Sequence, residues 1–287
     1  MRWLTRTLAA LALLAVLLWG GAVGYLWLNE PRLVFRSGFS HRPGAPIGAP
    51  FQPLQLAAPD GIRLDGVTLT AGDADPTRYW VIYFHGNAGS LRRPRVQQQL
   101  QTLHELGYDV LSFDYRGYGR SEGSPSEAGL YGDAHAAYDY LRRHGIDSSR
   151  IILAGQSLGS AVAVDLATRV ASAGVALFSP IDSVPLAAGR IYPWVPANYL
   201  ATNRFDSLAK APLLRRPVVV FHSATDRLIP FAAARTLYDA ITAPKRMLET
   251  AGGHNNAGFA EPDTLRQAFW GFWPVAAIAG EYVAAAD

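Results

Sequence analysis

Short apolar runs that alternate with longer segments of helical pattern constrain the fold of this chain more than any other feature. The run Trp80–Phe84 is apolar throughout, as expected of a strand that is covered on both faces of a sheet. Leu91–Leu106 follows with a helical pattern and is closed by Gly107, a residue that commonly ends helices. Val110–Phe113 is then the next apolar run. Such alternation predicts an α/β protein with a parallel sheet.

The same alternation continues along the chain, which at 287 residues is long enough for one large α/β domain. The predicted strands are Leu54–Ala58, Ile62–Thr70, Trp80–Phe84, Val110–Phe113, Ile151–Ala154, Val175–Phe178, Val218–Phe221 and Arg246–Glu249. The predicted helices are Leu91–Leu106, Ser126–Arg143, Leu158–Ala171, Phe231–Ile241 and Leu265–Trp273. The first two strands, which are turned at Pro59-Asp60-Gly61, are expected to be antiparallel. We predict a mostly parallel, twisted sheet of about eight strands with helices on both faces, in a domain over residues 54–287.

An insertion over residues 180–210, after the sixth strand, interrupts this alternation. It contains four prolines and is rich in aromatic residues. The carboxyl edge of a parallel sheet is where a lid or a substrate pocket is expected. We therefore predict a short lid in which Tyr192, Trp194 and Tyr199 contact the substrate. The alternative is a loop whose aromatic side chains only pack on the core.

The first thirty residues contain a long uncharged segment. From Leu8 to Leu28 there is no charged side chain, and a helix of this length would extend about 31 Å, which matches a hydrocarbon core of roughly 30 Å. Arg2 and Arg6 precede it, so the positive-inside rule predicts a single-pass anchor with a cytoplasmic N-terminus and an extracytoplasmic domain. The alternative is a signal peptide cleaved near residues 22–24, which gives a secreted protein. Residues 31–53, rich in Pro and Gly, are expected to form a stalk or linker.

The charge and cysteine content exclude several classes of function. Lys and Arg number 26 and Asp and Glu number 23, and the basic residues are scattered, so no nucleic-acid partner is expected. The chain has no cysteine, which rules out disulfides, a cysteine nucleophile and thiolate metal sites. No H-x-x-x-H pattern and no His/Asp cluster with ligand spacing occurs, so we expect no metal site.

Two segments match the pattern G-x-S-x-G, and their surroundings separate them. Gly155–Gly159 centres on Ser157, follows an apolar strand directly and opens a helix. This is the strand–turn–helix that holds a nucleophilic serine on a tight turn, with the helix N-terminus aimed at the developing oxyanion. Gly119–Gly123 centres on Ser121 and is followed by Ser124-Pro125, as in a loop. Ser157 is the predicted nucleophile.

A serine nucleophile needs a base and an acid that orients the base. His254 is the only histidine after the last predicted strand and follows Gly252-Gly253, so it is the predicted base, with His222 as the lesser candidate. Asp226 follows the strand Val218–Phe221 and is the predicted acid, with Asp182 as the alternative.

The oxyanion hole is expected from two loops. His85-Gly86-Asn87 follows the strand Trp80–Phe84, and an N–H from such a loop combines with the N–H of the residue after the nucleophile. We assign the backbone N–H groups of Asn87 and Leu158 to this role.

Taken together, these ordered motifs resemble the α/β-hydrolase superfamily over roughly residues 55–275. The motifs are His85–Gly89, Asp114–Gly119, Gly155–Gly159, Asp226 and Gly253-His254. The chain is most similar to the membrane-anchored, BEM46-like serine hydrolases and to monoacylglycerol, lysophospholipid and acyl-protein hydrolases. The resemblance implies hydrolysis of an acyl ester, thioester or amide without a cofactor, and a structural role for Asp114–Gly119.

The setting of the site favours an apolar or lipid-like carboxylic ester as substrate, because a membrane tether and an aromatic lid suit an apolar acyl group. A serine peptidase or amidase on the same three residues is the first alternative. A membrane-bound binding protein without catalytic activity is the second.

Overall fold

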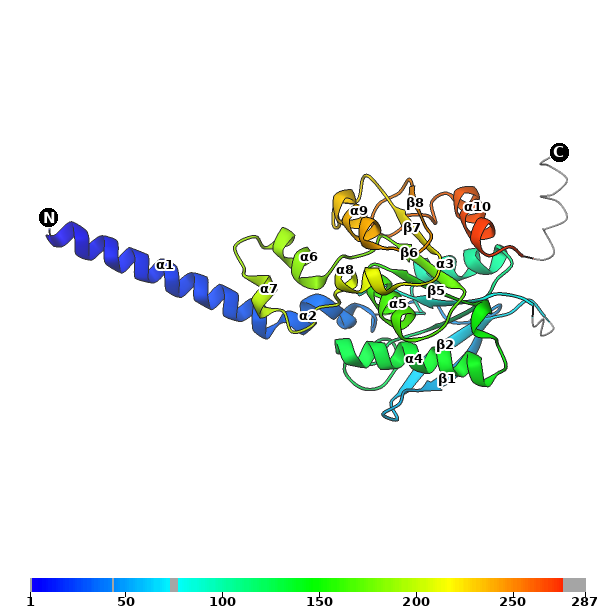
Figure 1. Cartoon of the computed structure of the whole chain (residues 1–287). Helices are drawn as coiled ribbons and strands as arrows, with labels where there is room; N and C mark the ends of the chain where they lie inside the picture. The colour runs from blue at the N-terminus through cyan, green and yellow to red at the C-terminus, as the bar shows by residue number, and fades with distance from the viewer. Residues whose placement is uncertain (1, 43, 73–76, 276–287) are drawn as a thin grey trace.

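One eight-stranded sheet forms the centre of the molecule in the computed structural model, which describes residues 2–42, 44–72 and 77–275 (Figure 1). The strand order is β1-β2-β4-β3-β5-β6-β7-β8. The strands are β1 (Gln52–Ala57), β2 (Arg63–Leu69), β3 (Trp80–Phe84), β4 (Asp109–Phe113), β5 (Ile151–Gln156), β6 (Gly174–Phe178), β7 (Val218–His222) and β8 (Lys245–Glu249). β2 pairs antiparallel with β1 and β4, and every other pair is parallel. The predicted mostly parallel sheet is confirmed.

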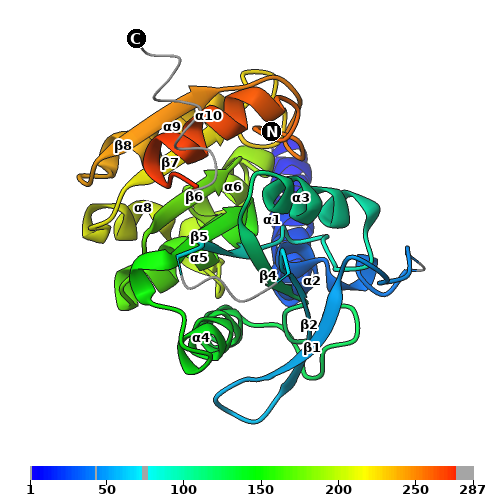
Figure 2. The ribbon, with the colours of Figure 1, turned by 90° about the vertical axis from the view of Figure 1, so that its right-hand side faces the viewer.

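Helices cover both faces of the sheet (Figure 2). The longer ones are α3 (Pro94–Glu105), α4 (Glu127–Arg143), α5 (Leu158–Arg169), α9 (Phe231–Ala240) and α10 (Pro262–Phe272). Side chains that alternate along a strand point to opposite faces. In β3, Ile82 and Phe84 belong to the core cluster under α4, α5 and α9, whereas Val81 and Tyr83 belong to the cluster under α3 and α10. Two cores thus sandwich the sheet, which explains why its strands are apolar throughout.

Helix boundaries follow local chemistry. The helix expected from Leu91 begins only at Pro94, because a proline fits the first turn, where its missing N–H is not needed. α4 begins after Ser126, whose side chain accepts a hydrogen bond from the Gly129 N–H, the usual N-cap arrangement. The predicted domain runs to residue 287, and its last twelve residues lie outside the described part of the chain.

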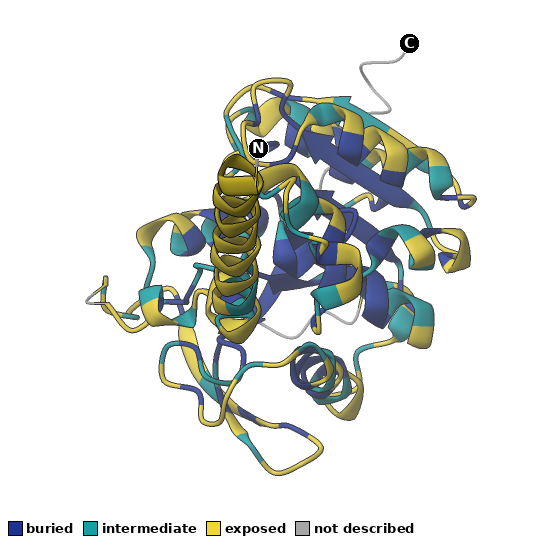
Figure 3. Ribbon diagram, turned by 90° about the vertical axis from the view of Figure 1, so that its left-hand side faces the viewer, coloured by how far each residue is buried: buried dark blue, intermediate teal, exposed yellow. Residues whose placement is uncertain are grey.

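The N-terminal helix α1 (Arg2–Leu28) extends away from the domain. Its mean hydropathy reaches 2.1, none of its residues is buried, and most of its length is exposed (Figure 3). Among the described residues it is the one helix that is long and apolar enough to cross a membrane.

Residues 30–39 depart from the loosely packed stalk that the Pro and Gly content suggests. They form α2 (Glu30–Phe35) and the short helix η1 (Ser37–Phe39). Phe35 is 1% exposed and contacts the ring of Phe205 edge-on, with 6.0 Å between the ring centres. The buried aromatic ring ties this segment to the core of the domain, so the stalk expectation fails here.

The insertion over residues 180–210 is mostly helical. It contains α6 (Val184–Ile191), α7 (Ala197–Leu200) and α8 (Ser207–Lys210). The insertion starts just after the carboxyl end of β6, next to the end of β5, and α6 and α7 lie on the side of the domain from which α1 leaves (Figure 1).

Candidate active site

Ser157 occupies a strained turn between β5 and α5. Its backbone angles are φ 52° and ψ −117°, a conformation that non-glycine residues rarely adopt. A Cβ at Gly159 would lie 2.1 Å from the Phe84 carbonyl oxygen, and a Cβ at Gly155 would lie 2.1 Å from the Gly159 carbonyl oxygen. The two glycines are therefore needed for the close packing of α5 against β3 and β5. This packing presents the Ser157 hydroxyl at the carboxyl edge of the sheet.

His254 and Asp226 join Ser157 in one chain of hydrogen bonds. His254 Nε2 lies 2.9 Å from Ser157 Oγ, and His254 Nδ1 lies 2.8 Å from Asp226 Oδ2. An ionised carboxylate only accepts hydrogen bonds, so Nδ1 carries the proton and Nε2 is free to accept one from the serine. The structure thus brings together the three residues that the sequence predicts, from the ends of β5, β7 and β8.

The Asp226 carboxylate is held ionised by its surroundings. Burial opposes its charge, but the hydrogen bond from His254 and those from the backbone N–H groups of Leu228 and Ile229, both 2.9 Å, together lower the pKa of Asp226 below its ordinary value. Oδ1 is occupied by the backbone and Oδ2 by the imidazole. The carboxylate is therefore fixed in the orientation that aligns His254.

Two glutamines, absent from the predicted site, hold the loop that carries His254. The side-chain amides of Gln156 and Gln99 donate to the Asn255 carbonyl oxygen at 2.8 and 3.1 Å. Thr225 Oγ1 donates to the Gly252 carbonyl oxygen at 2.6 Å. In the sequence, Gln99 is only a polar residue within a predicted helix, and its partner Asn255 lies 156 positions away. The sequence alone therefore could not show that Gln99 supports the His254 loop.

The alternative base and acid have structural roles. His222 is fully buried, its Nε2 donates to the Ile229 carbonyl oxygen at 2.9 Å, and burial lowers its pKa. His222 Nε2 lies 3.6 Å from Asp226 Oδ2. Asp182 is paired with Arg190 in the insertion.

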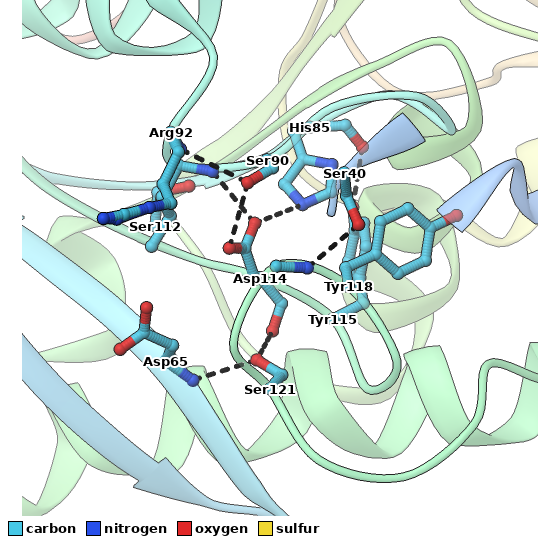
Figure 4. A network of polar contacts seen from close by, with 12 residues as sticks. Ser40, Asp65, His85, Ser90, Arg92, Ser112, Asp114, Tyr115, Tyr118 and Ser121 are labelled. Carbon is cyan, nitrogen blue, oxygen red and sulfur yellow. Dashed lines mark hydrogen bonds and ion pairs between the residues drawn. The ribbon is translucent and has the colours of Figure 1, made fainter. Parts of the chain in front are cut away.

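Ser121, the centre of the second G-x-S-x-G match, is an internal link of a polar network (Figure 4). Its hydroxyl donates to the Asp114 carbonyl oxygen and accepts from the Asp65 N–H. The Asp114 carboxylate in turn accepts from Leu91 N–H at 2.9 Å and lies 3.4 Å from the buried ring of His85. The Asp114–Gly119 segment therefore supports the loop after β3.

That loop carries Asn87, which lies beside Ser157 in the cavity wall together with Leu158. The Asn87 side-chain amide donates to the Val34 carbonyl oxygen at 3.0 Å, and the Asn87 backbone carbonyl oxygen lies 3.1 Å from the Tyr118 hydroxyl. α2 thus holds the loop in place. The backbone N–H groups of Asn87 and Leu158 have no acceptor within the described part of the chain, so both can donate to a ligand atom.

Two cavities meet at Ser157. One, of about 660 Å³, lies between α2, α6, α7 and the end of α1 and is lined mainly by aliphatic side chains. The other, of about 780 Å³, lies above α3. The wall of this second cavity contains no acidic residue. It contains four arginines that have no ion-pair partner in the described part of the chain: Arg36, Arg93, Arg95 and Arg227. The serine hydroxyl therefore lies between an apolar and a basic compartment.

The three aromatic residues of the predicted lid differ in their placement. Tyr192 lines the apolar cavity, whereas neither Trp194 nor Tyr199 lines either of the two. Tyr199 is 91% exposed. Ile191 and Leu200, which flank these two residues, face the cavity instead, so aliphatic rather than aromatic side chains form most of this wall.

No group of three or more His, Asp or Glu side chains within residues 2–42, 44–72 and 77–275 could hold a metal ion.

The sheet order, the serine on its tight turn and the order Ser, Asp, His along the chain define an α/β hydrolase. The chain belongs to the family described as serine aminopeptidase, S33, whose model matches residues 75–207.

Comparison with known proteins agrees with this assignment. The chain is 33% identical over 281 residues to the uncharacterized protein Rv2307c of Mycobacterium tuberculosis, covering 96% of this chain and 98% of the relative. The fold is similar to that of the esterase Pf2001 of Pyrococcus furiosus, with a TM-score of 0.65, 19% identity and coverage of 80% and 95%. It is also similar to Est1E of Butyrivibrio proteoclasticus, solved with ferulic acid bound, with a TM-score of 0.60, 17% identity and coverage of 75% and 96%.

Proposed function

We propose that this hydrolase cleaves carboxylic esters through an acyl-enzyme on Ser157. The observation that carries the proposal is the continuous hydrogen-bond chain from Asp226 through His254 to the Ser157 hydroxyl, which ends where two cavities meet. Such a chain activates a hydroxyl that is otherwise unreactive at neutral pH.

The reaction proceeds in two halves. His254 Nε2 takes the proton from Ser157 as its oxygen attacks the carbonyl carbon, and the N–H groups of Asn87 and Leu158 stabilise the oxyanion. His254 then gives the proton to the leaving alkoxide, which departs as an alcohol and leaves the acyl group on Ser157. In the second half, His254 removes a proton from a water molecule as the water oxygen attacks the carbonyl carbon of the acyl-enzyme. The tetrahedral intermediate then collapses, His254 returns the proton to the Ser157 oxygen, and the free acid departs.

The apolar cavity favours an apolar acyl group, because most of its wall is aliphatic. We further propose that α1 is retained as a single-pass anchor, as in the BEM46-like hydrolases, with Arg2 and Arg6 on the cytoplasmic side. N-terminal sequencing of the mature protein tests the anchor, and a new terminus near Tyr25 would show a cleaved signal peptide.

A fluorophosphonate probe tests the chemistry on the full-length protein in detergent. We expect the native protein and Ser121→Ala to be labelled and Ser157→Ala to remain unlabelled. Ser121→Ala is the matched control because it changes the second G-x-S-x-G serine, whose hydroxyl is used in the polar network. With p-nitrophenyl acetate, Asp226→Asn should lower kcat about 10³- to 10⁴-fold, since the amide favours the wrong imidazole tautomer. An unlabelled native protein, or an adduct on Ser157→Ala, would refute the proposal.

A peptidase is the second candidate, because the family model is described as a serine aminopeptidase and the same three residues can cleave amides. Comparing kcat/KM for p-nitrophenyl esters with that for aminoacyl p-nitroanilides separates the two. We expect the esters to be preferred.

A further inference from the structure

The insertion touches the N-terminal helix far from the point where that helix joins the domain. Trp19 Nε1 donates to the Trp194 carbonyl oxygen at 3.1 Å. Trp19 lies nine residues before Leu28, the last residue of α1, which corresponds to about 13 Å along the helix axis. The connection between α6 and α7 therefore reaches along the apolar helix, on the same side of the domain (Figure 1).

A second contact joins the insertion to the chain just after α1. The Glu30 carboxylate, just past the end of α1, accepts from both the backbone N–H and the side-chain amide of Asn203, each at 2.9 Å. Asn203 ends the uncharged part of the insertion and is 8% exposed. Charge-assisted hydrogen bonds are strong, and these two are partly buried, so the insertion is held beside the point where α1 ends.

The part of the insertion beside α1 is uncharged. Residues 191–203 contain no Asp, Glu, Lys or Arg, and Ile191, Trp194 and Tyr199 are 49%, 46% and 91% exposed. The nearest flanking charges are Arg190, paired with Asp182, and Arg204. Aromatic residues of this type concentrate at the interface between lipid and water. An exposed apolar segment that lies along an exposed apolar helix is suited to lipid rather than to water.

The apolar cavity is bounded by the same two elements. Leu26 and Trp27 of α1 line it from one side and Ile191 and Leu200 of the insertion from the other, and Ser157 lies in its wall. Its wall is thus partly made of the helix that would cross the membrane. A path from the leaflet to the serine then needs no passage through water.

We propose that the segment 191–201 inserts into the membrane beside α1, and that the substrate is a membrane-resident amphiphile whose acyl chain enters the cavity sideways from the lipid leaflet. The insertion of the segment stands on the contacts above, whereas the identity of the substrate rests also on the proposed esterase function. The bilayer is the one partner that would cover the exposed faces of α1 and of this segment together.

Depth measurements test the insertion directly, because the chain has no cysteine and a single one can be labelled. The full chain with Tyr199→Cys, carrying an NBD fluorophore, is placed in phosphatidylcholine vesicles with a nitroxide on the lipid acyl chains. We expect blue-shifted emission and at least twofold quenching. Arg143→Cys is the control, since Arg143 is exposed at the end of α4, by the edge of the sheet opposite Ser157, and should show neither. Equal emission and quenching at the two positions would overturn the insertion.

Hydrolysis tests the route of the substrate. Tyr199→Asp places a charge at a position that lines neither cavity. We expect unchanged hydrolysis of soluble p-nitrophenyl acetate and at least a fivefold slower hydrolysis of p-nitrophenyl palmitate held in vesicles. Arg143→Asp should leave both rates unchanged. Equal vesicle rates for Tyr199→Asp and the native protein would overturn the sideways route, whereas a native protein inactive on the acetate would instead refute the esterase function.

Discussion

Replacing Phe35 by alanine tests whether the segment after α1 is part of the catalytic domain. The ring is 1% exposed and contacts Phe205. Truncating a buried phenylalanine costs about 3–5 kcal/mol, from the lost transfer of apolar surface and the cavity that remains. In domains of 150–250 residues, 1 kcal/mol shifts Tm by about 2–4 °C. Phe35→Ala should therefore lower Tm by roughly 6–20 °C.

The Phe35→Ala substitution should also lower activity, because it loosens the support of the loop that carries Asn87. Phe35 follows Val34, whose carbonyl oxygen holds the side chain of Asn87. If α2 loosens, the loop that carries the predicted oxyanion donor loosens with it, so kcat for p-nitrophenyl acetate should fall, since one oxyanion donor is worth about 10²- to 10³-fold.

The assay is thermal unfolding of the full-length protein in detergent, followed by initial rates well below Tm. Leu33→Ala is the matched control on the same helix, because Leu33 is 43% exposed and its truncation should shift Tm by no more than a few degrees. A Phe35→Ala protein that melts within 2 °C of the native one would refute the packing of residues 30–39 as part of the domain.

Three further predictions concern the site and its supports. Gly159→Ala should abolish fluorophosphonate labelling of Ser157 and lower Tm, because the added Cβ would lie 2.1 Å from the Phe84 carbonyl oxygen. Gly189→Ala is the control and should change neither the labelling nor Tm, because no atom lies within 4 Å of its added Cβ. His222→Gln should weaken the loss of Tm on acidification: burial lowers the pKa of His222 in the folded protein, so below about pH 6.5 the unfolded chain takes up the proton first and stability falls. Identical Tm profiles between pH 5 and 8 for both proteins would contradict this. Arg227→Ala should raise KM for esters with an anionic leaving group and leave KM for neutral esters unchanged. The reason is that Arg227 lines the basic cavity and has no ion-pair partner among the described residues. Equal effects on the KM of both substrates would show that this arginine does not contact the leaving group.

Much of the fold was predictable because its signals are local. A strand buried on both faces must be apolar along its length, as β3 is, and the turn around Ser157 needs small residues on either side. The order of Ser157, Asp226 and His254 along the chain, together with a strand before each, was enough to place all three at one edge of the sheet.

The tertiary structure alone decided which distant segments support and enclose that edge. Glu30 and Asn203 are 173 positions apart, and Trp19 and Trp194 are 175 apart. No periodicity or motif encodes such pairs, because they depend on how whole elements pack. For the same reason the aromatic content of the insertion suggested a substrate wall, whereas packing turned Tyr199 to the surface and left aliphatic side chains beside Ser157. Local chemistry in the sequence determined the elements and the candidate site residues, and long-range packing determined their enclosure.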